Sequence, residues 1–220
     1  MIKSNFRCAV IFVSLVVIGS ANAQDMLKAD VQDFEVHKKN AFGLCGNLKM
    51  LCGWESALND SKASLREVKI AGGTQPVKDA LEKVVKENPR YQWSAGDGII
   101  NITPKRGERH LKNGKSPLDT IVDDFAVSNV TASEAAAMLC MAANIDCLPR
   151  EYAGPKRQFN KISLQLKKVT VRAALNAIIK ADGMASWAVQ FDGKTKRAIV
   201  DVNSWRPGGS LFKGAPKPRK

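Results

Sequence analysis

The sequence predicts an α/β fold of the α+β kind, with tandem small domains that are each β-α-β plus β-α-β-β and pack their helices on small sheets. The first observation behind this prediction is a repeat. The stretches that begin VKIAGGTQPVKDAL at Val68 and ISLQLKKVTVRAAL at Ile162 lie 94 positions apart, and both continue to a tryptophan and then to an Asp-Gly pair. The second observation is that apolar spacing changes between the strand period and the helix period in the same order in both stretches.

The first 23 residues have the pattern of a signal peptide. Lys3 and Arg7 precede an apolar run over 9–18, which ends at the small-residue site Ala-Asn-Ala at 21–23. The run is too short to span a bilayer, which takes roughly 20 apolar residues. We therefore expect cleavage after Ala23, export to the periplasm and no transmembrane segment in the mature chain.

Four candidate helices share one frame, in which apolar residues recur at positions 0, +3, +4, +7 and, in the last three, +8. The residues at position 0 are Ala41, Val77, Ala132 and Val171. Thr131 and Glu134 have the spacing of a capping box, and Asp182-Gly183 is a stop signal for the fourth helix. The first helix is the weakest, because Gly43 and Gly46 each lower helix propensity by about 1 kcal/mol relative to Ala.

Strands are predicted on both sides of these helices. An apolar residue stands seven positions before each position 0: Phe34, Ile70, Phe125 and Leu164. Sixteen positions after it come Trp93, Leu148 and Trp187 in the last three units. We interpret both tryptophans as core residues, with a ligand groove as the alternative. Hairpin strands are expected after Asp97-Gly98 and Asp192-Gly193.

The units group into two domains, 31–104 and 118–203. Between them, 105–117 (KRGERHLKNGKSP) has no apolar period and is predicted to be a basic linker. After Asn203, residues 204–220 lack the material for a core and are predicted to be a basic flexible tail.

Four cysteines follow the signal peptide: Cys45, Cys52, Cys140 and Cys147. An even number in two similarly spaced pairs favours disulfides in an exported protein. Zinc is the alternative, but its sites use closer cysteine pairs, and His37 and His110 fit neither pair. No metal and no cofactor is therefore predicted.

Geometry limits how these cysteines can pair. Two residues seven apart on an unbroken helix lie about 10 Å apart, beyond the roughly 7 Å between Cα atoms that a disulfide tolerates. Cys140 can meet Cys147 if the third helix ends near Asn144, and Cys45 can meet Cys52 if the first breaks at Gly46. We expect these two pairings, with pairing across the domains as the alternative.

Basic residues give the chain a formal net charge of +13, or +11 without Lys3 and Arg7. Many lie in the linker and the tail: Lys105, Arg106, Arg109, Lys112, Lys115, Lys213, Lys217, Arg219 and Lys220. Such residues attract acidic polysaccharide, lipid headgroups or an acidic protein, and simple solubility is the alternative interpretation. Because few aromatic residues accompany them, no specific nucleic-acid site is expected.

No pattern indicates catalysis. The two histidines lie in no nucleophile or metal motif, and the Asp123-Asp124 pair is interpreted as solvated surface at the start of a strand. The sequence therefore predicts that the protein is not an enzyme and has no catalytic residues.

The second domain resembles a known family in its strand and helix residues. These are Phe125 and Val127 in an opening strand, Ala135 and Ala136 in a helix, the strand 162–169, then Thr170, Ala174 and Leu175, and a terminal hairpin over 187–202. The pattern is similar to that of the secretin and TonB short N-terminal domain, or STN domain. The first domain resembles it well over 68–102 and weakly over 34–52.

The resemblance implies a small α/β module at the periplasmic end of outer-membrane machines, namely secretin pores and TonB-dependent receptors. In that family the domain contacts proteins, among them inner-membrane components and anti-sigma regulators, and performs no chemistry. No barrel or secretin core follows Asn203, so a pore or receptor would be a separate chain.

The expected function is therefore a periplasmic interaction module or adaptor for a secretin, a secretion or conjugation complex, or a TonB-dependent receptor. Strand edges that accept a partner strand are the expected docking sites. The alternative is a stand-alone basic envelope protein that binds an anionic glycan, a lipid or an acidic protein.

Overall fold

A computed structural model describes residues 23–36, 50–57, 68–109, 111, 115–149, 160–191, 195 and 197–204. The first half contains α1 (Ala23–Lys28), β1 (Asp30–Val36), β2 (Leu51–Glu55), β3 (Val68–Pro76), α3 (Val77–Glu87), β4 (Tyr91–Gly96) and β5 (Ile99–Pro104). The second half contains β6 (Ile121–Thr131), α4 (Ala132–Ala142), β7 (Cys147–Pro149), β8 (Lys161–Thr170), α5 (Val171–Asp182), β9 (Ala185–Phe191) and β10 (Ala198–Ser204). Two 3₁₀ turns, η1 (Arg106–Glu108) and η2 (Pro117–Asp119), lie between the halves.

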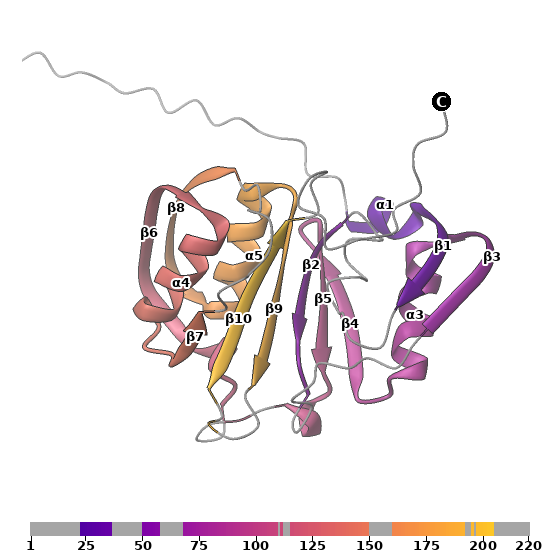
Figure 1. The fold of residues 1–220 in the computed structure, drawn as a ribbon, viewed down its shortest axis with the longest axis horizontal. Coiled ribbons are helices and arrows are strands. Elements are labelled where there is room, and N and C mark those ends of the chain that lie inside the picture. The colour runs from indigo at the N-terminus through magenta and orange to yellow at the C-terminus, as the bar shows by residue number, and fades with distance from the viewer. Residues whose placement is uncertain are drawn as a thin grey trace, which may run out of the picture.

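The described strands form three sheets, which confirms the predicted mixed α/β class (Figure 1). The largest has the order β4-β5-β2-β9-β10-β7, and the two others are the antiparallel pairs β1-β3 and β6-β8. In the second half, α4 and α5 lie between the β6-β8 pair and the large sheet (Figure 1). None of the helices in the described ranges is long and apolar enough to cross a membrane.

Both halves have the same strand plan. In each, an antiparallel hairpin (β4-β5 or β9-β10) takes a third strand parallel to its second strand, β2 on β5 and β7 on β10. The predicted spacing of 94 holds for α3 and α5, which begin at Val77 and Val171. It also holds for β4 and β9, so that Trp93 and Trp187 occupy the same position in their strands. We call residues related by this spacing counterparts.

Local signals in the sequence mark several element ends correctly. Thr131 and Glu134 form the predicted capping box at α4. Gly183, at φ +79°, ends α5 in the left-handed conformation that glycine adopts without steric cost. The Asp97-Gly98 pair has positive φ at both residues and joins β4 to β5, as a type I′ hairpin requires. The predicted first helix from Ala41 and the turn at 192–193 lie outside the described residues.

The predicted domains 31–104 and 118–203 each contribute three strands to the large sheet, and β2 joins them by pairing in parallel with β9 (Figure 1). Within the predicted linker, η1 is ordered and Ser116 is buried. Residues 1–22 of the predicted signal peptide and 205–220 of the predicted tail lie outside the described residues.

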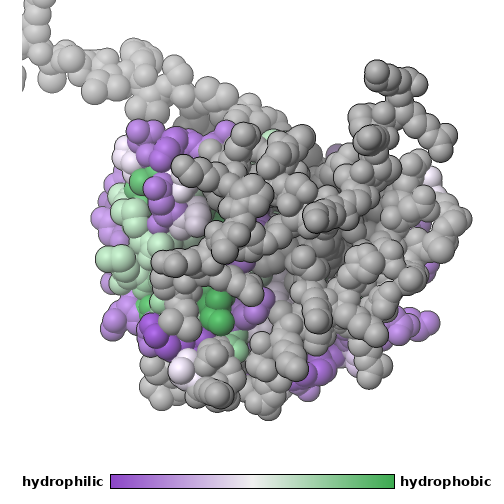
Figure 2. All heavy atoms as spheres, viewed as in Figure 1, coloured by the Kyte–Doolittle hydropathy of each residue, from purple (hydrophilic) through white to green (hydrophobic). Residues whose placement is uncertain are grey.

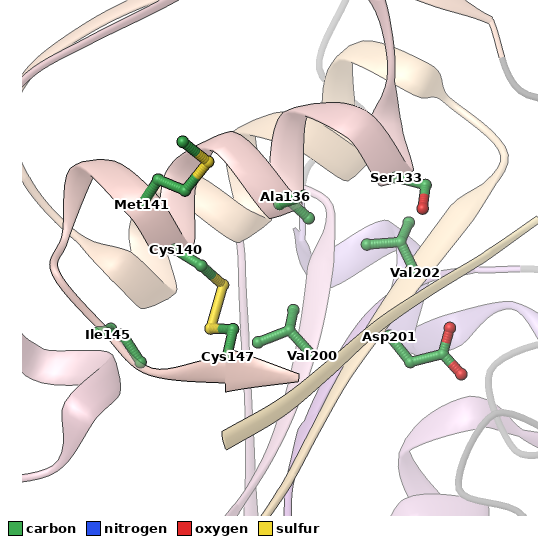
Figure 3. Close-up of a pocket in the computed structure, with 10 residues that line it drawn as sticks. Ser133, Ala136, Cys140, Met141, Ile145, Cys147, Val200, Asp201 and Val202 are labelled. Carbon is green, nitrogen blue, oxygen red and sulfur yellow. A yellow bond between two sulfur atoms is a disulfide. The ribbon is translucent and has the colours of Figure 1, made fainter. Parts of the chain in front are cut away.

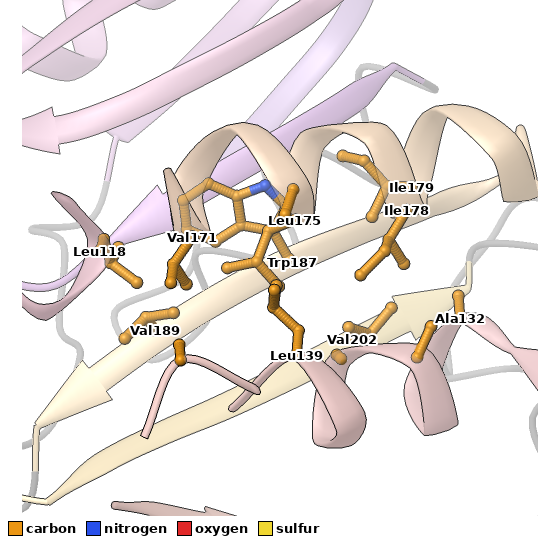
Figure 4. Packing of buried hydrophobic residues seen from close by; sticks show 14 of the residues in the cluster. Leu118, Ala132, Leu139, Val171, Leu175, Ile178, Ile179, Trp187, Val189 and Val202 are labelled. Carbon is orange, nitrogen blue, oxygen red and sulfur yellow. The ribbon is translucent and has the colours of Figure 1, made fainter. Parts of the chain in front are cut away.

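The core consists of two buried clusters, one mainly from each half, and each also includes a residue of the other half, Ala188 in the first and Ile99 in the second. In the first, Leu81, Val84, Ile100 and Ile102 pack around Trp54, whose ring stacks on Tyr91 at 6.1 Å between centroids. The core of the second half gathers residues from η2, both helices and the hairpin: Leu118, Leu139, Val171, Leu175, Ile178, Trp187 and Val202 among them (Figure 4). The interpretation of Trp187 as core is thus confirmed, whereas Trp93 is half-buried against the first core.

Candidate interaction site

The two halves meet where β2 pairs in parallel with β9. Gly53 lies opposite Trp187, and a Cβ atom at position 53 would overlap the indole ring. The indole is fully buried and donates a hydrogen bond of 2.7 Å from Nε1 to Oδ1 of Asn176 on α5. A strand can therefore pass this tryptophan only if it carries a glycine at that point.

Two residues further along β2, the carboxylate of Glu55 also contacts the second half. Glu55 is fully buried, and its two oxygens accept hydrogen bonds from Arg172 Nη2 at 2.7 Å and from Ser116 Oγ at 3.0 Å. Arg172 Nη2 also lies 3.6 Å from Asp119 Oδ1. Because an unpaired buried charge costs several kcal/mol, these partners favour the register that places Glu55 beside α5.

An open pocket lies on the opposite side of the second half, between α4 and β10 (Figure 3). Its volume is about 290 Å³, and its lining comes from α4, β10 and the turn into β7: Ser133, Ala136, Ala137, Cys140, Met141, Ile145, Cys147, Val200, Asp201 and Val202. The disulfide forms part of one wall, and Asp201 is the charged residue of the lining (Figure 3).

The rim of this pocket is apolar and exposed. Met141 is 80% exposed and Met138, also on α4, is 41% exposed. In the space-filling view, apolar atoms reach the surface on the side of the molecule where α4 lies (Figure 2). A flexible, polarisable methionine, Met141, at the edge of a small concave surface suits the binding of an apolar side chain from a partner.

The cysteines at this pocket are joined as predicted. Cys140 and Cys147 form a disulfide with 6.0 Å between their Cα atoms, because α4 ends at Ala142 and the chain turns back through Asn144 at φ +50°. This bond excludes the alternative in which either cysteine pairs with the first domain. Cys52 is buried and also disulfide-bonded, while Cys45 lies outside the described residues. In the part of the chain that the structure describes, no His, Cys, Asp and Glu side chains cluster as metal ligands would.

Four of the nine predicted basic residues lie in the part of the chain that the structure describes. Arg109 is held by the fold, because its guanidinium donates to the carbonyl of Pro104 and lies 3.7 Å from Asp119 Oδ2. Lys105, Arg106 and Lys115 are exposed. Lys112 and the tail residues Lys213, Lys217, Arg219 and Lys220 lie outside the described residues.

The pocket and the buried Glu55 cluster were not predicted from the sequence. A weak signal for the pocket exists, since small residues at 136 and 137 precede a cysteine pair. Nothing local signals that Glu55 would meet Arg172, because the two residues are far apart in the chain.

Comparison of the chain with protein-family models, with curated proteins and with solved structures finds no match.

Proposed function

We propose that the protein is a periplasmic protein–protein interaction module, an adaptor that docks on a secretin, a secretion or conjugation complex, or a TonB-dependent receptor. The observation that carries the proposal is the open pocket between α4 and β10, which is lined mainly by apolar residues and has Met141 exposed at its rim. An exposed apolar concavity is a common mark of protein contact sites.

Two further features support this proposal. The Cys140–Cys147 disulfide fits an oxidising compartment such as the periplasm. The strand and helix order of the second half, β6-α4-β7-β8-α5-β9-β10, follows the order of the STN pattern that the sequence resembles.

A crosslinking pull-down with the mature protein from envelope extracts tests the proposal. We compare the wild type with Ala137→Trp, which places a large side chain in the pocket from an exposed helix position. The matched control is Ala181→Trp, an exposed alanine on α5 that does not line the pocket. We expect the wild type and the control to capture a secretin, receptor or inner-membrane protein, and Ala137→Trp to lose it.

Binding measured at low and at high ionic strength distinguishes this function from the alternative, in which the protein binds an anionic glycan, a lipid or an acidic protein. Contacts through an apolar pocket persist at high ionic strength, whereas contacts through exposed basic loops weaken steeply. The exposed Lys105, Arg106 and Lys115 are the observation that favours the alternative. Capture of anionic glycan or lipid alone, equal for all three proteins and lost at high salt, would overturn the adaptor function.

A further inference from the structure

Each strand of the hairpin β9-β10 in the second half has a counterpart in the hairpin β4-β5 of the first half. The outer edge of β9 is occupied by β2, which pairs with it in parallel. The counterpart of β9 is β4, at the end of the large sheet (Figure 1). Among the described strands, β4 pairs only with β5.

The other outer strands carry features that oppose pairing with a further strand, such as charges, prolines and bulges. β7 has three residues and ends at Pro149. Both two-stranded sheets contain a register shift, and their strands are rich in charge: Asp30, Asp33, Glu35, Lys69, Asp123, Asp124, Lys161, Lys167 and Lys168. β4 (YQWSAG) has six residues, no charge, no proline and no register shift.

The residues that hold β2 on β9 have counterparts around β4. Trp93 is the counterpart of Trp187, and it is half-buried where Trp187 is covered by Gly53. Lys78, exposed at the start of α3, is the counterpart of Arg172, the partner of Glu55. The first half thus has, beside β4, the same kinds of residue that contact β2 in the second half: an aromatic residue and a cation.

The backbone N–H and C=O groups of β4 also point in the direction that pairing with an added strand requires. The carbonyl of Val189 accepts a hydrogen bond of 2.8 Å from the amide of Ser56, so the backbone of residue 189 faces the incoming strand. Its counterpart is Ala95. Because N–H and C=O groups of alternate residues point to the same side of a strand, Trp93 and Ala95 both present theirs at the outer edge of β4.

We propose that β4 binds an extended segment of another protein, which adds in parallel to the outer edge of the sheet. The segment carries glycine opposite Trp93 and Asp or Glu two residues later, within reach of Lys78. This inference rests on the proposed interaction function and specifies a second docking surface for it. Main-chain hydrogen bonds supply affinity in such strand addition, and the side-chain contacts supply specificity.

A second copy of this chain does not supply the segment. Of the 16 glycines, only Gly53 is followed two residues later by an acidic residue. Gly53 lies in β2, which is already paired on both sides with β5 and β9. The partner is therefore a different protein.

A peptide that copies the strand which β9 already accepts can test the inference. The probe is residues 50–57 with Cys52→Ser, added to the ¹⁵N-labelled mature protein. We expect its binding to shift the backbone amides of Trp93 and Ala95. A peptide that also carries Gly53→Val should bind at least about tenfold more weakly, the ratio that about 1.4 kcal/mol gives. Glu55→Lys in the peptide should weaken binding in the same direction.

A protein variant provides the second arm. Ala95→Pro removes an outward N–H of β4 and leaves the hydrogen bonds to β5 intact, so it should abolish the shift of the Trp93 amide, which is the remaining reporter because proline has no N–H. Gln92→Ala, an exposed side chain on the same strand, is the matched control and should bind the peptide as the wild type does.

Absence of shifts at β4 in the wild type, or equal binding of the Gly53→Val peptide, would overturn the inference, and neither result depends on the folding of a variant. The envelope pull-down separates this failure from failure of the proposed function. If the wild type captures a partner that Ala137→Trp loses, and the peptide gives no shifts at β4, the β4 site is wrong and the adaptor function stands. If the wild type captures no protein, the adaptor function is wrong whatever the peptide does.

Discussion

Gly53 is the residue of the first half that lies opposite Trp187 of the second. Its lack of a side chain lets the indole of Trp187 pack directly on β2, and Glu55 then reaches Arg172. Both contacts depend on one register, since a shift by a single residue would move each side chain to the other face of the sheet. One small residue thus determines how a strand of the first half fits the second.

Gly53→Val should destabilise the protein by roughly 1 to 3 kcal/mol, the usual cost of forcing extra methyl groups into a packed site. Urea unfolding followed by circular dichroism measures the change. Gly96→Val is the matched control, because a Cβ atom at Gly96 meets nothing within 4 Å and the residue lies at the exposed end of β4. Equal stability of the two variants would show that the Trp187 contact is unimportant for folding.

The helix frame predicted the buried faces of α4 and α5 residue by residue, whereas Val85, predicted on the buried face of α3, is half-buried. Ala132, Ala135, Ala136, Leu139 and Cys140 are all buried on α4, as the shared spacing requires. The difference between Trp187 and Trp93 was not predictable in this way, because it depends on whether a distant strand lies beside each tryptophan. Local periodicity identifies the inward face of an element but carries no information about its neighbours across the sheet.

Among the elements, α4 has the most complete N-terminal cap. The amide and the hydroxyl of Thr131 both donate to a carboxylate oxygen of Glu134, and Lys161 lies 3.4 Å from the same oxygen. The hydrogen bond from the Thr131 backbone, then that from its side chain, then Lys161, hold the pKa of Glu134 below its ordinary value of 4.5. α4 also forms one wall of the pocket, so the cap fixes the helix on which the candidate site is built.

The lowered pKa of Glu134 gives stability a pH dependence. A carboxylate with a depressed folded-state pKa stabilises the protein above its unfolded value, and this contribution is lost as pH falls through the folded value. We therefore expect Glu134→Gln to be less stable than the wild type at pH 7 and equal to it near pH 2, measured by urea unfolding at both values. A difference that persists undiminished in acid would contradict the assignment. Asp123→Asn, at an exposed aspartate on β6, serves as the control.

At the scale of elements, the sequence predicted the helices and strands that recur in both halves, but it did not predict the strand pairing that joins the halves. The 94-residue spacing correctly placed α3, α5, β4 and β9, and Asp97-Gly98 correctly placed one hairpin turn. The pairing of β2 with β9 was not predicted, because Gly53 and Trp187 lie on different domains of the predicted division. The pocket was missed for a similar reason, since its walls come from a helix and a strand that only the fold brings together.

For the whole molecule, the continuous sheet has a thermodynamic consequence. Breaking the β2-β9 contact would expose the Trp187 ring and leave the Glu55 carboxylate without Arg172. Each loss is unfavourable, so neither half should unfold while the other stays intact.

We therefore expect one cooperative unfolding transition for the wild type. Amide hydrogen exchange as a function of denaturant should report the same opening free energy for α3 and α5, one helix from each half. In Gly53→Val the two values should separate. Two distinct transitions in the wild type would show instead that the halves are independent folding units.

The order β4-β5-β2-β9-β10-β7 repeats the strand order of the first half in the second, with the strand directions reversed. A two-fold axis that exchanged the ends of the sheet would make those ends identical, as in an isologous dimer. The repeated order instead makes the ends different: one end is a hairpin strand, β4, and the other is the short third strand, β7. Any protein that recognises one end finds nothing equivalent at the other, so the molecule can link two different neighbours in one order only.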